Sequence, residues 1–145
     1  SELVVTGGRA PGPGPLKAAI VKIANVFDGA IARNLKPIEA HDIMCHIADA
    51  VLAGGIRRAA MLALFSPNDM EMMSAKSGNW WEVNPQRGRA NNSVILLRGK
   101  TSFNLFQKVW KAIEASGSGE PGIYSAITYS WHIVDSPKYP IHSRC

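Results

Sequence analysis

The stretch Ala53-Gly54-Gly55-Ile56-Arg57-Arg58-Ala59-Ala60-Met61-Leu62-Ala63-Leu64-Phe65 decides the fold class of this chain of 145 residues. Its last part, from Ala59 to Phe65, is an uninterrupted apolar run whose length and flanks predict a strand buried on both faces. The glycine pair ends a predicted helix, and two arginines separate that helix from the strand. Helices that alternate with buried strands are typical of α/β proteins.

Upstream of this stretch, the sequence predicts a strand, a loop and two helices. Residues 3–6 read as a short strand, and the alternating Gly and Pro of residues 7–15 predict a loop. A helix then runs from Pro15 to Asn34, and a second begins at Pro37. The apolar face of the first helix consists of Leu16, Ile20, Ile23, Phe27 and Ile31. That of the second consists of Ile43, Ile47, Ala50, Val51 and Gly54.

Downstream, the pattern again alternates between helix and strand. Residues 66–69 predict a turn that caps a short helix over 70–76, and residues 80–89 read as irregular. Residues 93–97 predict a second buried strand. Thr101 then caps a helix that carries Phe103, Phe106, Trp110 and Ile113 on one face. Residues 116–122 read as a loop, and residues 123–134 as a strand or hairpin.

Charge and cysteine content narrow the class of partner. Sixteen basic residues against eleven acidic ones leave a net charge of +5, which attracts phosphate groups. Because the basic residues are scattered, a small anionic ligand is favoured over direct binding of nucleic acid or of a membrane surface. No apolar run approaches the roughly 20 residues that a membrane helix needs, so we expect a cytoplasmic protein. Two cysteines, Cys45 and Cys145, fit a reducing compartment.

Two polar stretches are candidate ligand sites. The stretch Gly54-Gly55-Ile56-Arg57-Arg58 has glycines, which allow close approach of the backbone, and arginines, which suit phosphates. On composition alone, a helix end with two solvated arginines is the favoured interpretation. The second stretch is Gln86-Arg87-Gly88-Arg89-Ala90-Asn91-Asn92-Ser93, in which two carboxamides and a hydroxyl precede a predicted strand. These side chains either lie at the end of a sheet where ligands bind or form only a polar turn. The loop over residues 7–15 either closes over a ligand or simply links a strand to a helix.

The histidines and acids form no catalytic or metal-binding pattern. His41 and His46 are five residues apart, about 140° around a helix, so they cannot share one metal and a structural role is favoured. Asp42 and Asp49 read as solvated carboxylates. Cys45 lies one turn after His41, which permits a thiol–base pair, but a buried structural thiol is favoured.

Several short motifs, in order, resemble one known family. They are Gly7-Gly8-Arg9-Ala10-x-Gly12-Pro13-x-Pro15-Leu16, Ile38-Glu39-x-His41-Asp42-Ile43-Met44-Cys45, Ala53-Gly54-Gly55-Ile56-Arg57-Arg58, Ala75-Lys76-Ser77-Gly78-Asn79-Trp80, Ala90-Asn91-Asn92-Ser93 and Ser116-Gly117-Ser118-Gly119-Glu120. Across residues 3–123 the chain resembles the catalytic chain of ribonucleotide reductase, and most closely its adenosylcobalamin-dependent class.

The resemblance implies a fold, a reaction and two nucleotide loops. The family has a ten-stranded α/β barrel in which a cysteine thiyl radical starts the reduction of ribonucleotides, so the implied partners are a ribonucleotide substrate and a deoxyribonucleotide effector. The loops that couple effector to substrate choice correspond to Gly7, Gly8 and Arg9 and to Gly54, Gly55, Ile56, Arg57 and Arg58. Asn91, Asn92 and Ser93 correspond to a barrel strand near the substrate.

The departures from the family predict a fragment. The radical motif Asn-Pro-Cys-x-Glu is absent, and neither Cys45 nor Cys145 replaces it. Residues 1–124 read as a partial α/β barrel of two or three strands, and residues 125–145 as a divergent tail with a C-terminal β segment. We therefore expect a chain that is inactive alone, binds no adenosylcobalamin by itself, and pairs with a complementary reductase fragment or with itself. The alternative is a stand-alone α/β domain for nucleotide binding or protein interaction.

Overall fold

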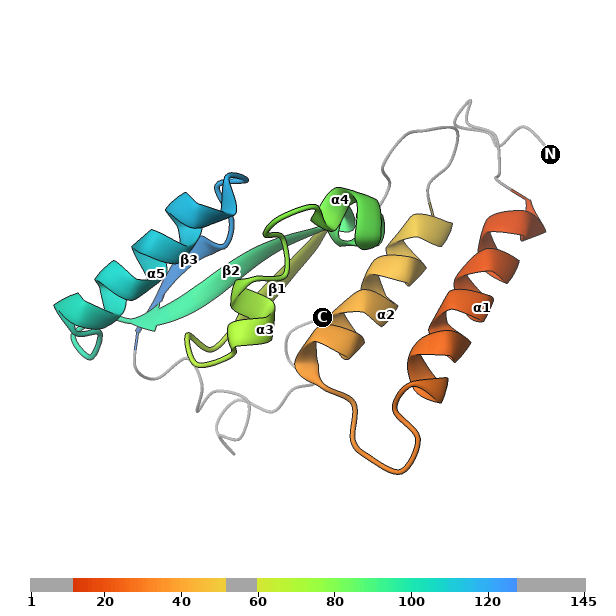
Figure 1. Ribbon diagram of the computed structural model, residues 1–145, viewed down its shortest axis with the longest axis horizontal. Coiled ribbons are helices and arrows are strands. Elements are labelled where there is room, and N and C mark those ends of the chain that lie inside the picture. Colours follow the sequence, from red (N-terminus) through yellow and green to blue (C-terminus); the bar gives the residue numbers. More distant parts are fainter. Residues whose placement is uncertain (1–11, 52–59, 128–145) are drawn as a thin grey trace, which may run out of the picture.

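The computed structural model describes residues 12–51 and 60–127 and has an α/β fold, as expected (Figure 1). Three parallel strands form one sheet in the order β1-β2-β3. The elements are α1 (Pro13–Asp28), α2 (Pro37–Ala50), β1 (Met61–Phe65), α3 (Met70–Met73), α4 (Trp80–Val83), a 3₁₀ helix η1 (Pro85–Arg89), β2 (Ala90–Leu97), α5 (Phe103–Ser116) and β3 (Gly122–Ala126). No helix in these ranges is long and apolar enough to span a bilayer.

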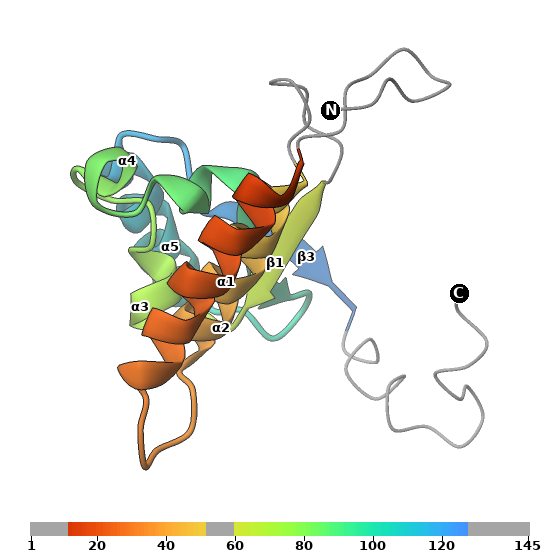
Figure 2. The same cartoon turned by 90° about the vertical axis from the view of Figure 1, so that its right-hand side faces the viewer.

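The helices lie on one side of the sheet, and the core forms there (Figure 2). Strand residues alternate between the two faces, so every second residue of β1 and β2 meets the helices, whereas Ile123 and Ser125 on the same side of β3 stay exposed. The core residues are Ala63, Phe65, Val94 and Leu96 from the strands and Ile38, Met72, Met73, Ala75, Val109, Ala112 and Ile113 from the segments packed on them. Val94 on the central strand is fully buried.

The opposite side of the sheet, which we call the helix-free face, consists of Leu62, Leu64, Asn91, Ser93, Ile95, Leu97, Gly122, Tyr124 and Ala126. Ile95 and Ala126 on this face are buried, but its outer side chains are exposed. Leu62 is 55% exposed, Leu64 44% and Tyr124 45%. The prediction that the first long strand is buried on both faces is therefore wrong for β1, because no described helix covers this side. Parallel sheets normally have both faces covered, so the helix-free face is unusual for an isolated domain.

The first helix differs from its prediction at both ends. It begins at Pro13, two residues before the predicted start at Pro15, and ends at Asp28 instead of Asn34. The guanidinium of Arg33 explains the early end, because it donates to the Gly29 carbonyl at 3.0 Å and pairs with Glu39 at 2.6 Å, which holds the chain in a turn. The predicted apolar face stays largely exposed, and the buried residue of α1 is Ala19.

The second helix begins at Pro37 as predicted, but a different face is buried. The buried residues of α2 are Ile38, His41, Cys45 and His46, whereas Ile47 and Val51 of the predicted face are exposed. The apolar pattern could not reveal this orientation, because polar residues of α2 find partners on the sheet and on η1.

Three further local predictions need correction. Residues 80–89 form α4 and η1 and are not irregular. Ser102 caps α5 by accepting from the Leu105 amide, while the predicted cap, Thr101, instead donates to the Leu97 carbonyl. The second long strand begins at Ala90, so Asn91, Asn92 and Ser93 lie within β2 and do not precede it. Residues 3–6 and 128–134, also predicted as strand, lie outside the described ranges.

Candidate functional site

The two predicted nucleotide loops, Gly7–Arg9 and Gly54–Arg58, lie outside the described residues. Their described neighbours can still be placed. The start of α1, the end of α2 and the start of β1 lie at the same end of the molecule (Figures 1 and 2). Because the sheet is parallel, the amino end of β2 lies at this end as well. We call this region the amino end of the sheet and take it as the candidate site.

The three polar residues at the start of β2 divide between the two faces. Asn92 points to the helices, is 3% exposed, and its Oδ1 lies 2.9 Å from His41 Nε2. Asn91 and Ser93 belong to the helix-free face, and their side chains have no hydrogen-bond partner within residues 12–51 and 60–127. Asn91 and Ser93 are therefore available to a ligand, whereas Asn92 is bound within the protein.

The Cys45 thiol is a core group. It is fully buried on α2, and its Sγ lies 3.8 Å from each ring nitrogen of His41. Burial raises the pKa of Cys45 to about 12, and the nearby Asp42 charge acts in the same direction. A fully buried thiol that is protonated at neutral pH is a poor nucleophile, so its environment favours the structural interpretation over the thiol–base alternative.

Asp42 is not the solvated carboxylate that the sequence predicted. Arg87 donates to its two oxygens, from Nε at 2.8 Å and from Nη2 at 2.7 Å, and Gln86 Nε2 lies 3.3 Å from Oδ1. Burial acts to raise the pKa of Asp42, but the hydrogen bonds from Arg87 and His41 outweigh it and hold the pKa well below its usual range. The pair ties α2 to η1, which precedes β2 directly.

Asp49 also differs from its prediction as a solvated carboxylate, because it forms an ion pair with Arg89 of η1. Two acids on α2 therefore hold two arginines of the 3₁₀ helix. The polar stretch that begins at Gln86 is thus anchored on α2 in its first half. Of its last residues, in β2, only Asn91 and Ser93 belong to the helix-free face.

A second, partly buried ion pair joins the amino ends of β2 and β3, and sequence reasoning missed it. Lys76 Nζ lies 2.9 Å from Oε1 and 2.8 Å from Oε2 of Glu120, and it also donates to the Ala90 carbonyl. The side chains are 6% and 25% exposed. The signal in the sequence for this pair is that Lys76 directly follows a stretch with the apolar residues Met72, Met73 and Ala75, which favours burial of the lysine.

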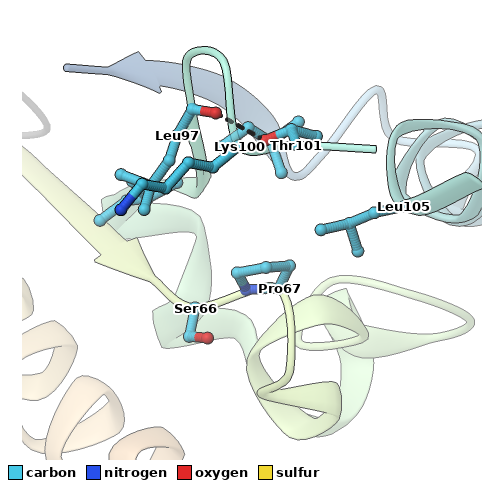
Figure 3. A pocket seen from close by; sticks show the side chains of 8 residues that line it. Ser66, Pro67, Leu97, Lys100, Thr101 and Leu105 are labelled. Atoms are coloured by element: carbon cyan, nitrogen blue, oxygen red, sulfur yellow. Dashed lines mark hydrogen bonds between the residues drawn. The ribbon is translucent and has the colours of Figure 1, made fainter. Parts of the chain in front are cut away.

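The cavities with room for a water-sized molecule lie away from the amino end of the sheet. A cavity of about 290 Å³ opens at the carboxyl ends of β1 and β2, between Pro67 and Leu105 (Figure 3). Its lining is mainly apolar, and its cation, Lys100, is exposed. Two more, of about 490 and 350 Å³, lie beside α5.

None of these cavities fits adenosylcobalamin, because drug-sized ligands already need roughly 300–1,000 Å³ and a corrinoid is much larger. In residues 12–51 and 60–127, no three His, Cys, Asp or Glu side chains are grouped so that they could hold a metal ion.

The comparisons with known proteins point to one enzyme. Over 117 residues, 81% of this chain, the chain is 35% identical to the adenosylcobalamin-dependent ribonucleoside-triphosphate reductase of Lactobacillus acidophilus. The identity to proteins of the same name is 35% for Lactobacillus delbrueckii subsp. bulgaricus and 34% for Lactobacillus leichmannii. The match spans 15% of the length of each of these relatives. No family model matches the chain, and no solved structure matches it.

Proposed function

We propose that this chain is a region of the catalytic domain of an adenosylcobalamin-dependent ribonucleotide reductase and forms an arc of its α/β barrel. The observation that carries the proposal is the helix-free face, combined with 35% identity over 117 residues to a reductase of that class. In an α/β barrel, helices cover the outside of a parallel sheet and the inner face is covered by the other strands. A three-strand arc taken alone has this one-sided arrangement.

The proposed role of the amino end of the sheet is to bind nucleotide. Asn91 and Ser93 face the barrel interior in this proposal and contribute to the substrate side. Gly7–Arg9 and Gly54–Arg58 supply the two specificity loops, with Arg57 and Arg58 as phosphate or base contacts. The position of their described neighbours at the amino end of the sheet, together with the net charge of +5, supports this role.

Catalysis requires groups that this chain does not carry. The sequence contains no Asn-Pro-Cys-x-Glu motif, and the thiol of Cys45 is fully buried. We therefore assign no catalytic step to the chain and no binding of adenosylcobalamin by its described residues. In this proposal, the radical cysteine and the cofactor site come from other parts of the reductase.

A nucleotide-binding measurement tests this proposal. A ligand that binds only the folded state raises the melting midpoint, so a thermal melt followed by circular dichroism with a panel of ribo- and deoxyribonucleoside triphosphates reports binding. We expect a raised midpoint for the full chain. Changing both Arg57 and Arg58 to Ala should weaken binding more than tenfold, since each charged hydrogen bond contributes about 1.5–3 kcal/mol.

The matched control for that experiment is Arg98→Ala. Arg98 is exposed and follows β2 at the opposite, carboxyl end of the sheet. The control should bind as the unaltered chain does. Equal affinity of the double variant and of Arg98→Ala would contradict the role of the second loop.

A second candidate function is a stand-alone nucleotide-binding or interaction domain without catalysis. The buried core on the helix side, together with the pairs His41–Asn92 and Lys76–Glu120, favours it, because these contacts do not need further strands. This candidate predicts that the helix-free face is covered by a second copy. Light scattering after size exclusion tests this candidate, because a monomer would contradict it, whereas a dimer fits both functions.

A further inference from the structure

Lys76 is a buried cation that joins three segments of the chain. It follows α3, it donates to the carbonyl of Ala90 at the start of β2, and it pairs with Glu120 just before β3. Its ammonium also lies 5.6 Å from the centre of the Trp80 ring. A buried ammonium needs partners of this kind, because an unpaired charge away from water is strongly unfavourable.

Glu120 continues the sheet beyond the point where β3 begins. The first residue of β3, Gly122, is opposite Ser93, so the backbone amide of Asn92 has no strand partner on that side. Glu120 Oε2 accepts from this amide at 3.3 Å. One carboxylate therefore binds both the Lys76 ammonium and the backbone of β2, and satisfies an amide that would otherwise lack a partner.

This arrangement determines where the two available side chains of β2 lie. Asn92 is held from its backbone by Glu120 and from its side chain by His41, at 2.9 Å. Its neighbours Asn91 and Ser93 must therefore point to the helix-free face. On that face Gly122 leaves room for the hydroxyl, since a Cβ at this position would stand 2.9 Å from Ser93 Oγ.

We propose that Lys76 and Glu120 are positioning residues for Asn91 and Ser93, so that nucleotide binding at the amino end of the sheet depends on this buried ion pair. This inference rests on the proposed function, because it takes Asn91 and Ser93 as ligand-facing. Neither Lys76 nor Glu120 touches the ligand. Both act through the backbone of β2.

The test compares Glu120→Ala with Glu114→Ala in the full chain. Glu114 lies on α5 and binds Trp110 Nε1 at 2.8 Å, so the control removes an equal charge away from β2. We expect amide hydrogen exchange of Asn92, measured by NMR, to accelerate at least tenfold in Glu120→Ala only. Glu120→Gln keeps one acceptor oxygen, so we expect a smaller acceleration of exchange at Asn92 in this variant. It replaces the alanine variant in the test if Glu120→Ala does not fold.

Nucleotide affinity is measured on the same proteins at a temperature where all are folded, with Val109→Ala as a control for lost core packing. We expect affinity to fall at least fivefold in Glu120→Ala and to hold in both controls. Unchanged exchange at Asn92, or an unchanged affinity, overturns the positioning role. If the unaltered chain binds no nucleotide, the proposed function is contradicted instead. The positioning role is then decided by whether Glu120→Ala changes the exchange rates and NMR shifts of Asn91 and Ser93.

Discussion

Replacing Asp42 with alanine should destabilise the folded chain by about 3 kcal/mol. The side chains of Asp42 and Arg87 are only 13% and 15% exposed, and two short hydrogen bonds join them. Removing one member of a buried pair costs about 3–5 kcal/mol, because the other charge stays behind. The lower end of this range applies here, since the pair is only partly buried and Arg87 keeps a hydrogen bond to the Ala75 carbonyl at 3.0 Å.

The same carboxylate makes the stability depend on pH in a defined direction. The folded-state pKa of Asp42 is depressed below the unfolded value of about 3.9. The stability from the pair is therefore fully present above about pH 4 and is lost as the pH falls through the folded-state pKa. In Asp42→Ala this part of the acid sensitivity should be absent.

Urea unfolding followed by circular dichroism at pH 7 and at pH 3 measures both effects. The matched control is Asp28→Ala, because Asp28 is exposed at the end of α1 and pairs with no described residue, so we expect a change within about 0.5 kcal/mol. A loss below 1 kcal/mol for Asp42→Ala at pH 7, or the same loss at both pH values, would refute the reasoning.

Two further predictions concern single groups. The hydrogen bond from Arg33, with a backbone hydrogen bond from Lys36, lowers the pKa of Glu39 to about 2, so an NMR titration should give a midpoint near 2 that returns towards about 4.3 in Arg33→Ala. A midpoint near the ordinary value in the unaltered chain would contradict the pairing. Because burial raises the pKa of Cys45 to about 12, a thiol reagent at pH 8 should label a Cys145→Ser chain only after unfolding. Rapid labelling of the folded chain would show that the thiol is accessible.

Element ends that depend on local backbone chemistry could be predicted from the sequence. Pro37 begins α2, and Asp69, in the predicted turn, caps α3 by accepting from the Met72 amide at 3.0 Å. Gly117 ends α5 with a φ of 64°, a conformation that glycine adopts without strain. Each of these signals acts within a few residues, so neighbouring residues suffice to find it.

Polar partners far apart in the sequence could not be predicted in this way. Asp42 and Arg87 are 45 residues apart, and Lys76 and Glu120 are 44 apart. A charged residue on a helix has the pattern of a solvated one until its partner is known, so the pattern around Asp42 and Lys76 does not indicate their ion pairs. Only the folded chain brings these groups together.

Apolar periodicity also has a physical limit, which α1 and β1 illustrate. The spacing of Leu16 and Ile20, and the apolar run containing Leu62 and Leu64, both indicate faces that favour burial. In the structure these four side chains are exposed, since no described element covers them. A periodic pattern predicts that a face needs a partner but does not say which one. Further barrel strands are the partner that our proposal assigns to Leu62 and Leu64.

A chimeric reductase tests the central claim most directly. The 117 residues of this chain that match the Lactobacillus leichmannii reductase would replace the matched region of that enzyme. Reduction of a ribonucleoside triphosphate would then be measured with adenosylcobalamin and a thiol reductant. If the chain is an arc of the reductase barrel, the chimera should fold and keep turnover within about tenfold of the parent, roughly 1.4 kcal/mol in the barrier. A chimera that folds as the parent does but has no turnover would contradict the claim.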